Sequence, residues 1–177
     1  VRNATGEMKG LELELEYQAT DSLYLSAALG VMDSEYDDGQ FFAGATVLGI
    51  PQPEVDIGGN SFPYAPETTA NLFAEWTMAS TDYGDVMLSG TARYQDEIWF
   101  DPFNEEKINQ FAPMKPVASE DSYWLLDARL ELSSEQYTFA LWGKNLTDEY
   151  YIPFGSDTSS FGHTVLVPGE PRMYGIE

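Results

Sequence analysis

Residues 11–17 read LELELEY, a strict alternation of apolar and acidic side chains. Successive side chains of a β-strand point to opposite faces, so a strand here has leucines on one face and glutamates on the other. A helix would instead distribute the same glutamates around its axis. The alternation therefore predicts a strand over about residues 7–19, with one apolar face and one charged face.

Further segments repeat this pattern, each with apolar side chains two residues apart. They are Leu23–Val31, a strand from Thr68 with Leu72, Ala74, Trp76 and Met78 on its apolar face, Val86–Tyr94 with an end near Trp99, Trp124–Leu132 and Tyr137–Leu141. A seventh strand begins near Pro171 and is cut off at Glu177. Strands of roughly 11–15 residues exceed the five or six typical of soluble sheets. They match a tilted membrane crossing, which takes about 9–11 residues plus extensions.

The connections between these strands alternate between short and long. The short ones are Thr20–Ser22, Ser80–Gly84 and Ser133–Gln136, and the long ones are approximately 37–67, 101–120 and 152–168. In outer-membrane barrels short turns face the periplasm and long loops face outward. The sequence therefore predicts an all-β fold, an antiparallel up-and-down transmembrane β-barrel, of which this chain holds about six complete strands and a truncated seventh.

Charged residues fall on the faces opposite the apolar ones: Glu12, Glu14, Glu16, Glu75, Arg93, Asp127, Arg129, Glu131 and Lys144. A lipid-facing Arg or Lys costs roughly 2–4 kcal/mol at the bilayer midplane, so we expect the charged faces to line the lumen. An interfacial girdle of aromatic residues is predicted near the strand ends: Tyr17, Tyr24, Trp76, Tyr94, Trp99, Trp124, Tyr137 and Tyr150. A two-residue turn at Glu135 would also place Asp127 opposite Lys144 inside the lumen, where the two side chains could pair across strands.

A soluble β-sandwich remains an alternative, because two packed sheets of alternating strands have the same parity. Composition excludes other classes more firmly. The formal charge of -22, from 8 basic and 30 acidic residues, argues against a nucleic-acid partner, since phosphate binding depends on Lys and Arg. With no cysteine in the chain, neither a disulfide nor a thiolate metal site can form.

The sequence offers no arrangement that suits an enzyme, a cofactor or a metal ion. His163 is the one histidine, and the adjacent acidic pairs Glu105-Glu106 and Asp148-Glu149 would point to opposite faces of a strand. No phosphate-binding, nucleophile-elbow or zinc-helix motif occurs. The acidic residues of 37–67 lack the regular spacing of a Ca²⁺ loop, so we interpret them as a solvated surface.

Two segments near the end of the chain add a family resemblance. WGKNLTDEYY (142–151) and PGEPRMYGI (168–176) resemble the penultimate and last strands of TonB-dependent outer-membrane receptors, as do the Gly10–Glu14 and LLDARL (125–130) segments for earlier strands. We interpret the matching residues as architectural. They are Asn145, Leu146, Asp148, Tyr150, Pro168, Gly169, Pro171 and Arg172.

The resemblance implies that residues 1–177 form the C-terminal part of a barrel of 22 strands in the outer membrane of a Gram-negative bacterium. The plug domain and the TonB-contacting region are then expected outside this chain. Such receptors import a scarce nutrient, such as a ferric siderophore, haem, cobalamin or a glycan. The implied partners are outer-membrane lipid, TonB and a small-molecule or metal-chelate ligand. A passive porin-like channel has the same wall and remains the alternative.

Aromatic residues in the long connections are the candidate ligand contacts, because aromatic side chains in loops offer stacking surface. These candidates are Tyr64, Trp99, Phe100, Phe103 and Phe161.

Overall fold

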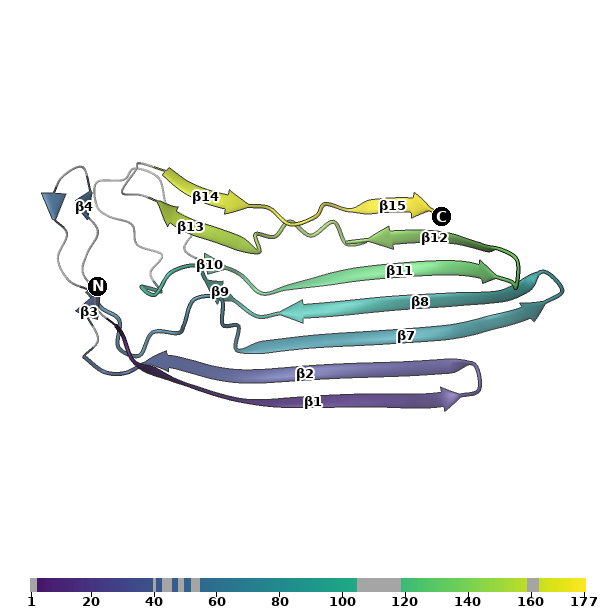
Figure 1. Ribbon diagram of the computed structural model, residues 1–177, viewed down its shortest axis with the longest axis horizontal. Helices are drawn as coiled ribbons and strands as arrows, with labels where there is room; N and C mark the ends of the chain where they lie inside the picture. Colours follow the sequence, from purple (N-terminus) through teal and green to yellow (C-terminus); the bar gives the residue numbers. More distant parts are fainter. Residues whose placement is uncertain are drawn as a thin grey trace.

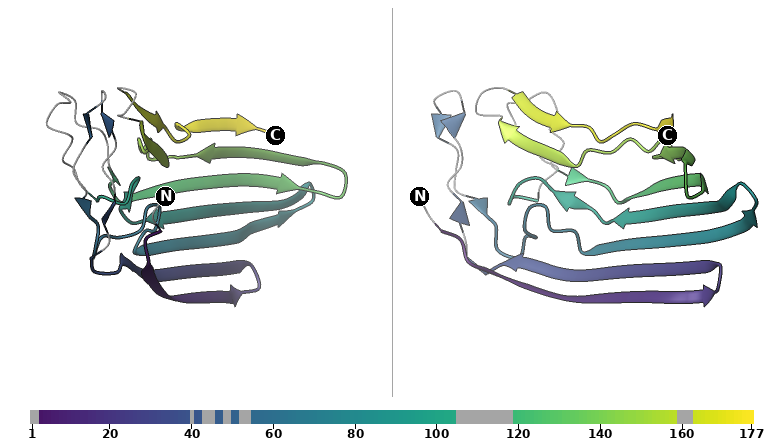
Figure 2. Two further views of the ribbon diagram at one scale, coloured as in Figure 1. Left: turned by 60° about the vertical axis from the view of Figure 1, so that its left-hand side comes forward. Right: turned by 45° about the vertical axis from the view of Figure 1, so that its right-hand side comes forward.

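A seven-stranded antiparallel sheet with the order β1-β2-β7-β8-β11-β12-β15 dominates the computed structural model (Figure 1). The structure describes residues 3–39, 41–42, 46–47, 50–51, 55–104, 119–158 and 163–177. The strands are β1 (Gly6–Thr20), β2 (Leu23–Tyr36), β7 (Thr68–Thr81), β8 (Gly84–Gln95), β11 (Tyr123–Ser133), β12 (Thr138–Lys144) and β15 (Met173–Ile176). Each long strand lies beside the next one in the chain, which confirms the predicted up-and-down topology. The sheet is open, with β1 and β15 at opposite edges (Figure 2).

Tight turns join the strands at one end of the sheet, called the turn end here, and the long connections gather at the other, the loop end (Figure 1). The β1–β2 ladder closes on the pair Thr20 and Leu23, and the β7–β8 ladder on Thr81 and Gly84. At the third turn, the Ser134 amide donates to the Tyr137 carbonyl at 2.9 Å. All three turns therefore contain two residues, including the predicted turn at Glu135.

One face of the sheet is apolar and uncovered. A single row of paired residues crosses five strands through Leu15, Ala27, Leu72, Ala92 and Leu126. Leu15 is 60% exposed and Leu72 is 46% exposed. A sandwich would bury such a face against a second sheet, and none packs there among the described residues. Because burying a leucine contributes roughly 1.5–3 kcal/mol, an apolar surrounding over this face would stabilise the protein.

The opposite face of the sheet carries the charges, as predicted. Arg93 of β8 pairs with Asp127 of β11 at 2.7 Å, and Arg129 pairs with Glu131 and with Glu177, each at 2.7 Å. The first pair joins the neighbouring strands β8 and β11, the Arg129–Glu131 pair lies within β11, and the Arg129–Glu177 pair reaches past β12 to the residue after β15. A hydrocarbon surrounding would not tolerate these side chains. The alternation of the sequence therefore separates an apolar face from an ion-paired one.

The structure differs from the predicted faces in two details. A bulge at Met78, between Thr77 and Ala79, interrupts the regular alternation of this strand and brings Ala79 opposite Val86. Tyr24 pairs with Glu75 on the charged face, so it does not belong to the aromatic girdle of the apolar face. Strand parity, rather than closeness to a strand end, decides which face a side chain occupies.

The long connections contain four small ladders that the sequence reading missed. They are β3 (Phe41–Phe42) with β6 (Val55–Asp56), β4 (Thr46–Val47) with β5 (Ile50–Pro51), β9 (Ile98–Trp99) with β10 (Ser119–Glu120), and β13 (Phe154–Thr158) with β14 (His163–Val167). Six of these strands have only two residues and cannot display a period of two, whereas β13 and β14 have five residues each. The fourth predicted strand is accordingly two strands, since β8 ends at Gln95 and Trp99 belongs to β9.

Compact packing is found at the loop end rather than within the sheet. Ile98, Phe100 and Ile152 form the one cluster of buried apolar residues in the described part of the chain, with 3%, 7% and 6% exposure. Ile57, next to β6, is 1% exposed. Among the residues that the structure describes, no helix is long and apolar enough to cross a membrane. The fold thus consists of a thin wall with a packed group of loops at one end.

Candidate functional site

Tyr64 joins three connections at the loop end. Its amide donates to the carbonyl of Trp99 at 2.9 Å, and its hydroxyl donates to the carbonyl of Gly155. Its ring is stacked on Phe154, with centroids 5.9 Å apart and planes 9° apart, and lies 5.8 Å from the ring of Phe100. Tyr64 has a φ of 58°, a left-handed conformation that is unfavourable for a bulky residue. The contacts on both sides hold it there.

Phe100 lies beneath this contact. A Cβ atom added at Gly155 would overlap the Phe100 ring, so glycine permits the close approach of β13 to the loop. The ring is 7% exposed and belongs to the buried cluster with Ile98 and Ile152. Phe100, predicted as a ligand contact, therefore packs the loops together and presents little surface.

The other candidate aromatic residues occupy intermediate or undescribed positions. Trp99 and Phe103 are half-buried, and Tyr64 is 41% exposed. The Asn60 side chain donates to the carbonyls of Pro102 and Phe103, both at 3.0 Å, and thereby fastens the first connection to the second. Phe161 lies outside the described residues. The structure brings Tyr64, Trp99 and Phe100 together.

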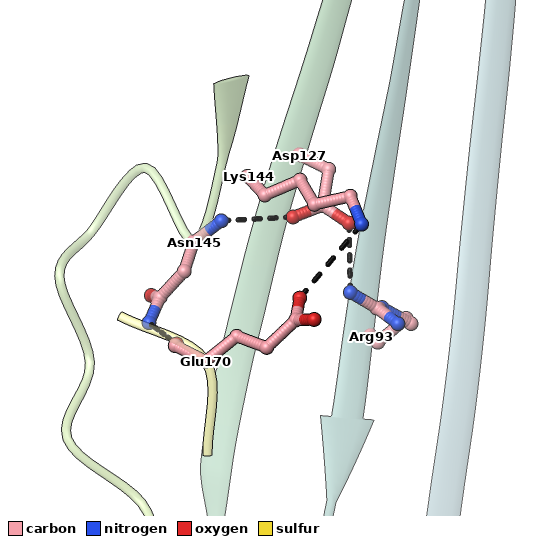
Figure 3. A network of polar contacts seen from close by, with 5 residues as sticks. All are labelled: Arg93, Asp127, Lys144, Asn145 and Glu170. Carbon is pink, nitrogen blue, oxygen red and sulfur yellow. Dashed lines mark hydrogen bonds and ion pairs between the residues drawn. The ribbon is translucent and has the colours of Figure 1, made fainter. Parts of the chain in front are cut away.

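A separate group of polar contacts anchors the last strand of the sheet (Figure 3). The Asn145 side chain donates to the carbonyls of Glu149 and Glu170 at 2.8 and 3.0 Å and accepts from the Glu149 amide at 2.9 Å. Asn145 is 3% exposed and has a φ of 48°, a conformation that asparagine tolerates better than most residues. One side chain therefore closes the turn after β12 and holds the backbone that leads into β15.

Asp127 supports this anchor from β11. Its carboxylate accepts from the Asn145 amide at 2.9 Å and from Arg93 at 2.7 Å (Figure 3). Asp127 and Lys144 face each other on the charged face, as predicted, because Ala128 pairs with Gly143, but no ion pair joins the two side chains. Lys144 lies instead 3.7 Å from Glu170. The carboxylate pairs with the arginine of the other neighbouring strand, whose guanidinium can hold it in a fixed geometry.

The remaining motif residues lie around the anchor. Leu146 covers Gly143, where an added Cβ would come within 2.6 Å of the leucine side chain. The Asp148 amide donates to the Asn145 carbonyl at 2.9 Å, and the carboxylate pairs with Arg172 at 3.1 Å. The Gly169 amide donates to the Tyr151 carbonyl at 2.8 Å, beside the exposed residues Pro168 and Pro171. Tyr150 is 74% exposed.

Glu120 of β10 is an acidic residue at the loop end with a shifted pKa. Burial raises the pKa of the Glu120 carboxyl above its ordinary value, although a hydrogen bond from the Ile152 backbone acts in the opposite direction. The nearby carboxylates of Asp121 and Glu149 raise the pKa further. Within the described residues, no group of three or more His, Cys, Asp or Glu side chains is arranged to hold a metal ion.

The sequence reading missed several residues of these sites. Phe154 and Gly155 complete the Tyr64 contacts, and the β-branched residues of 163–167 are the signal that would have predicted their hairpin. Trp142 covers Gly175 of β15, because a Cβ added there would overlap the indole ring. An aromatic ring packed over a glycine of a neighbouring strand helps to fix the pairing register of the two strands. Glycine positions of this kind cannot be recognised without the neighbouring strand.

Comparisons with known proteins agree with this architecture. The family described as "TonB dependent receptor-like, beta-barrel" matches residues 1–146. A curated protein of Haemophilus influenzae, an uncharacterized TonB-dependent receptor, is 24% identical over 163 residues, which cover 90% of this chain and 41% of that protein.

Two solved structures have the same fold. The ferric yersiniabactin uptake receptor FyuA of Yersinia pestis has a TM-score of 0.73 and 19% identity, over 98% of this chain and 23% of that one. The siderophore receptor PiuA of Acinetobacter baumannii has a TM-score of 0.73 and 20% identity, over 98% and 21%. The chain thus spans less than half the length of these relatives. The fold and the family match together confirm the resemblance seen in the motifs, and the chain belongs to the TonB-dependent receptor family as a section of its β-barrel.

Proposed function

We propose that this chain is part of an outer-membrane receptor of a Gram-negative bacterium that imports a ferric siderophore by TonB-dependent transport. The match to the receptor barrel over residues 1–146 carries the proposal. A porin-like channel would share the periodicity of the wall, but that match favours active uptake. The names of the two similar structures, a ferric yersiniabactin uptake receptor and a siderophore receptor, support a siderophore over haem, cobalamin or a glycan.

In this proposal the apolar face contacts outer-membrane lipid and the charged face lines the interior of the barrel. Uncovered leucines on one face and ion pairs on the other support this orientation. The turn end then faces the periplasm and the loop end faces outward. TonB acts through a region of the complete receptor that lies outside this chain.

The ligand is proposed to bind at the loop end through exposed aromatic side chains. Tyr64 and Phe154 are stacked and are 41% and 46% exposed, so each ring presents a free edge or face to a ligand. Phe100 supports them from below. Trp99 and Phe103, which are half-buried, and Phe161 complete the set of proposed contacts.

Uptake of radiolabelled iron by cells that carry the complete receptor gene tests this function. We expect iron supplied as a siderophore to accumulate in cells with the receptor and to stop accumulating when tonB is deleted. Phe154→Ala should weaken binding of the chelate to the cells, whereas Tyr83→Ala, at an exposed tyrosine of the turn end, should not. Accumulation that persists without TonB would contradict the proposal and support a passive channel.

A further inference from the structure

Within the described residues, three connections at the loop end contact one another directly. Residues 55–67 precede β7, residues 96–104 follow β8, and residues 150–158 follow β12. Figure 1 shows them gathered at one end of the sheet although they leave it between different strands. Loops that moved independently would need no shared core, yet the buried cluster combines Ile98 and Phe100 with Ile152.

We propose that these three connections open and close as one unit, with Tyr64 as the joint between them. Tyr64 belongs to the first connection, hydrogen bonds to the backbone of the second through Trp99, and hydrogen bonds to the backbone of the third through Gly155. Its ring contacts both Phe100 of the second connection and Phe154 of the third. Displacing any one connection therefore breaks contacts to both of the others.

Two further contacts tie the same segments together without Tyr64. Asn60 reaches the carbonyls of Pro102 and Phe103, each at 3.0 Å. Glu120 of β10 pairs with Ile98 of the second segment, and its carboxyl is hydrogen bonded to the Ile152 backbone of the third. These contacts connect the first connection to the second, and the second to the third. Contiguous groups of contacts of this kind open cooperatively in folded proteins, which gives their amides a common opening free energy.

The joint has a direct consequence for regulation of the loop end. A perturbation applied to one connection is transmitted to the other two, and the coupling is the same from either side because linkage is reciprocal. Any molecule that orders one of these connections will order all three. This coupling between the loops does not depend on which ligand the receptor binds.

Hydrogen exchange of the complete receptor in detergent micelles, followed by mass spectrometry, tests the proposal. Tyr64→Phe keeps the ring and removes the hydroxyl that donates to Gly155. Loss of one hydrogen bond corresponds to about fivefold faster exchange, the equivalent of about 1 kcal/mol. We expect that acceleration in all three segments, with exchange in β7, β8 and β11 unchanged. Tyr150→Phe removes a hydroxyl from an exposed tyrosine of the third segment and should change none.

A second variant applies the perturbation from the opposite side. Phe154→Leu removes the ring stacked on Tyr64 and should accelerate exchange in 55–67 as well as in its own segment 150–158. Acceleration confined to the mutated segment, in either variant, would show that the connections move independently and would overturn the proposal. If Tyr64→Phe left hydrogen exchange unchanged in all three segments, Tyr64 would not be the joint between them.

Discussion

Replacing Asn145 tests the anchor of the last strand. Asn145→Ala removes three side-chain hydrogen bonds, which join it to Glu149 and Glu170. At about 1 kcal/mol for each bond, their loss destabilises the anchor by about 3 kcal/mol. The left-handed φ of 48° adds roughly 1–2 kcal/mol for alanine. We therefore expect a local destabilisation of about 4 kcal/mol, or up to about 10³-fold faster exchange.

Asn145→Gly separates the two contributions. Glycine adopts the left-handed conformation without steric cost but restores no hydrogen bond, and its greater freedom in the unfolded chain costs about 0.5–1 kcal/mol. The Asn145→Gly variant should therefore be destabilised slightly less than the Asn145→Ala variant. Asn71→Ala, at an exposed position of β7, is the matched control and should have little effect.

Hydrogen exchange of segments 145–150 and 168–176 in the complete receptor measures these effects. Both segments should exchange faster in Asn145→Ala and Asn145→Gly, because the same side chain holds both. If Asn145→Gly behaved as the wild-type protein, the hydrogen bonds would not stabilise the last strand and the reasoning would be refuted.

Three other variants test the wall and the loop end. Gly175→Ala should displace β15, because the new methyl group overlaps the indole of Trp142; we expect reduced barrel assembly, measured by heat-modifiable gel mobility, and partial recovery when Trp142→Ala is added. Leu13→Arg on the apolar face should destabilise the membrane-embedded barrel by roughly 2–4 kcal/mol, whereas Glu14→Arg on the charged face should not, as urea unfolding in lipid vesicles would show. The raised pKa of Glu120 implies a contribution to stability that is present below the ordinary value of 4.5 and lost as pH rises through the higher folded pKa. Glu120→Gln should therefore remove that pH dependence from hydrogen exchange at 119–122, after correction for intrinsic exchange rates. An equal loss of protection with rising pH in the variant and in the wild-type protein would contradict the assignment.

The sequence predicted the wall well because its determinants are local and repetitive. Alternation in residues 11–17 determines which face each side chain occupies, and the two-residue turns fix the register of neighbouring strands. The interruption of the alternation at Met78, between Thr77 and Ala79, becomes visible only when the pairing with β8 is known. Asp127 shows where sequence-based prediction ends. Its face was predicted, but its pairing with Arg93 of β8 rather than Lys144 of β12 depends on how far each side chain extends toward it.

The loop end was predicted poorly because its contacts join residues that are distant in sequence. Tyr64 and Gly155 are 91 positions apart, and no periodic pattern relates them. The need for glycine at residue 155 arises from the ring of Phe100, which belongs to another connection. The sequence singled out aromatic residues of these segments as candidate ligand contacts. It did not distinguish rings that pack the loops from rings that present surface.

In the proposed orientation, the apolar face of the sheet contacts lipid and the charged face does not. Single cysteines placed in turn along residues 124–132 of β11, in the complete receptor, allow spin labelling at each position, since this section has no native cysteine. In lipid bilayers, accessibility to dissolved oxygen should alternate with a period of two, high at Leu126, Ala128 and Leu130 and low at Asp127 and Arg129. Uniform accessibility, or maxima at Asp127 and Arg129, would contradict the assignment of the two faces.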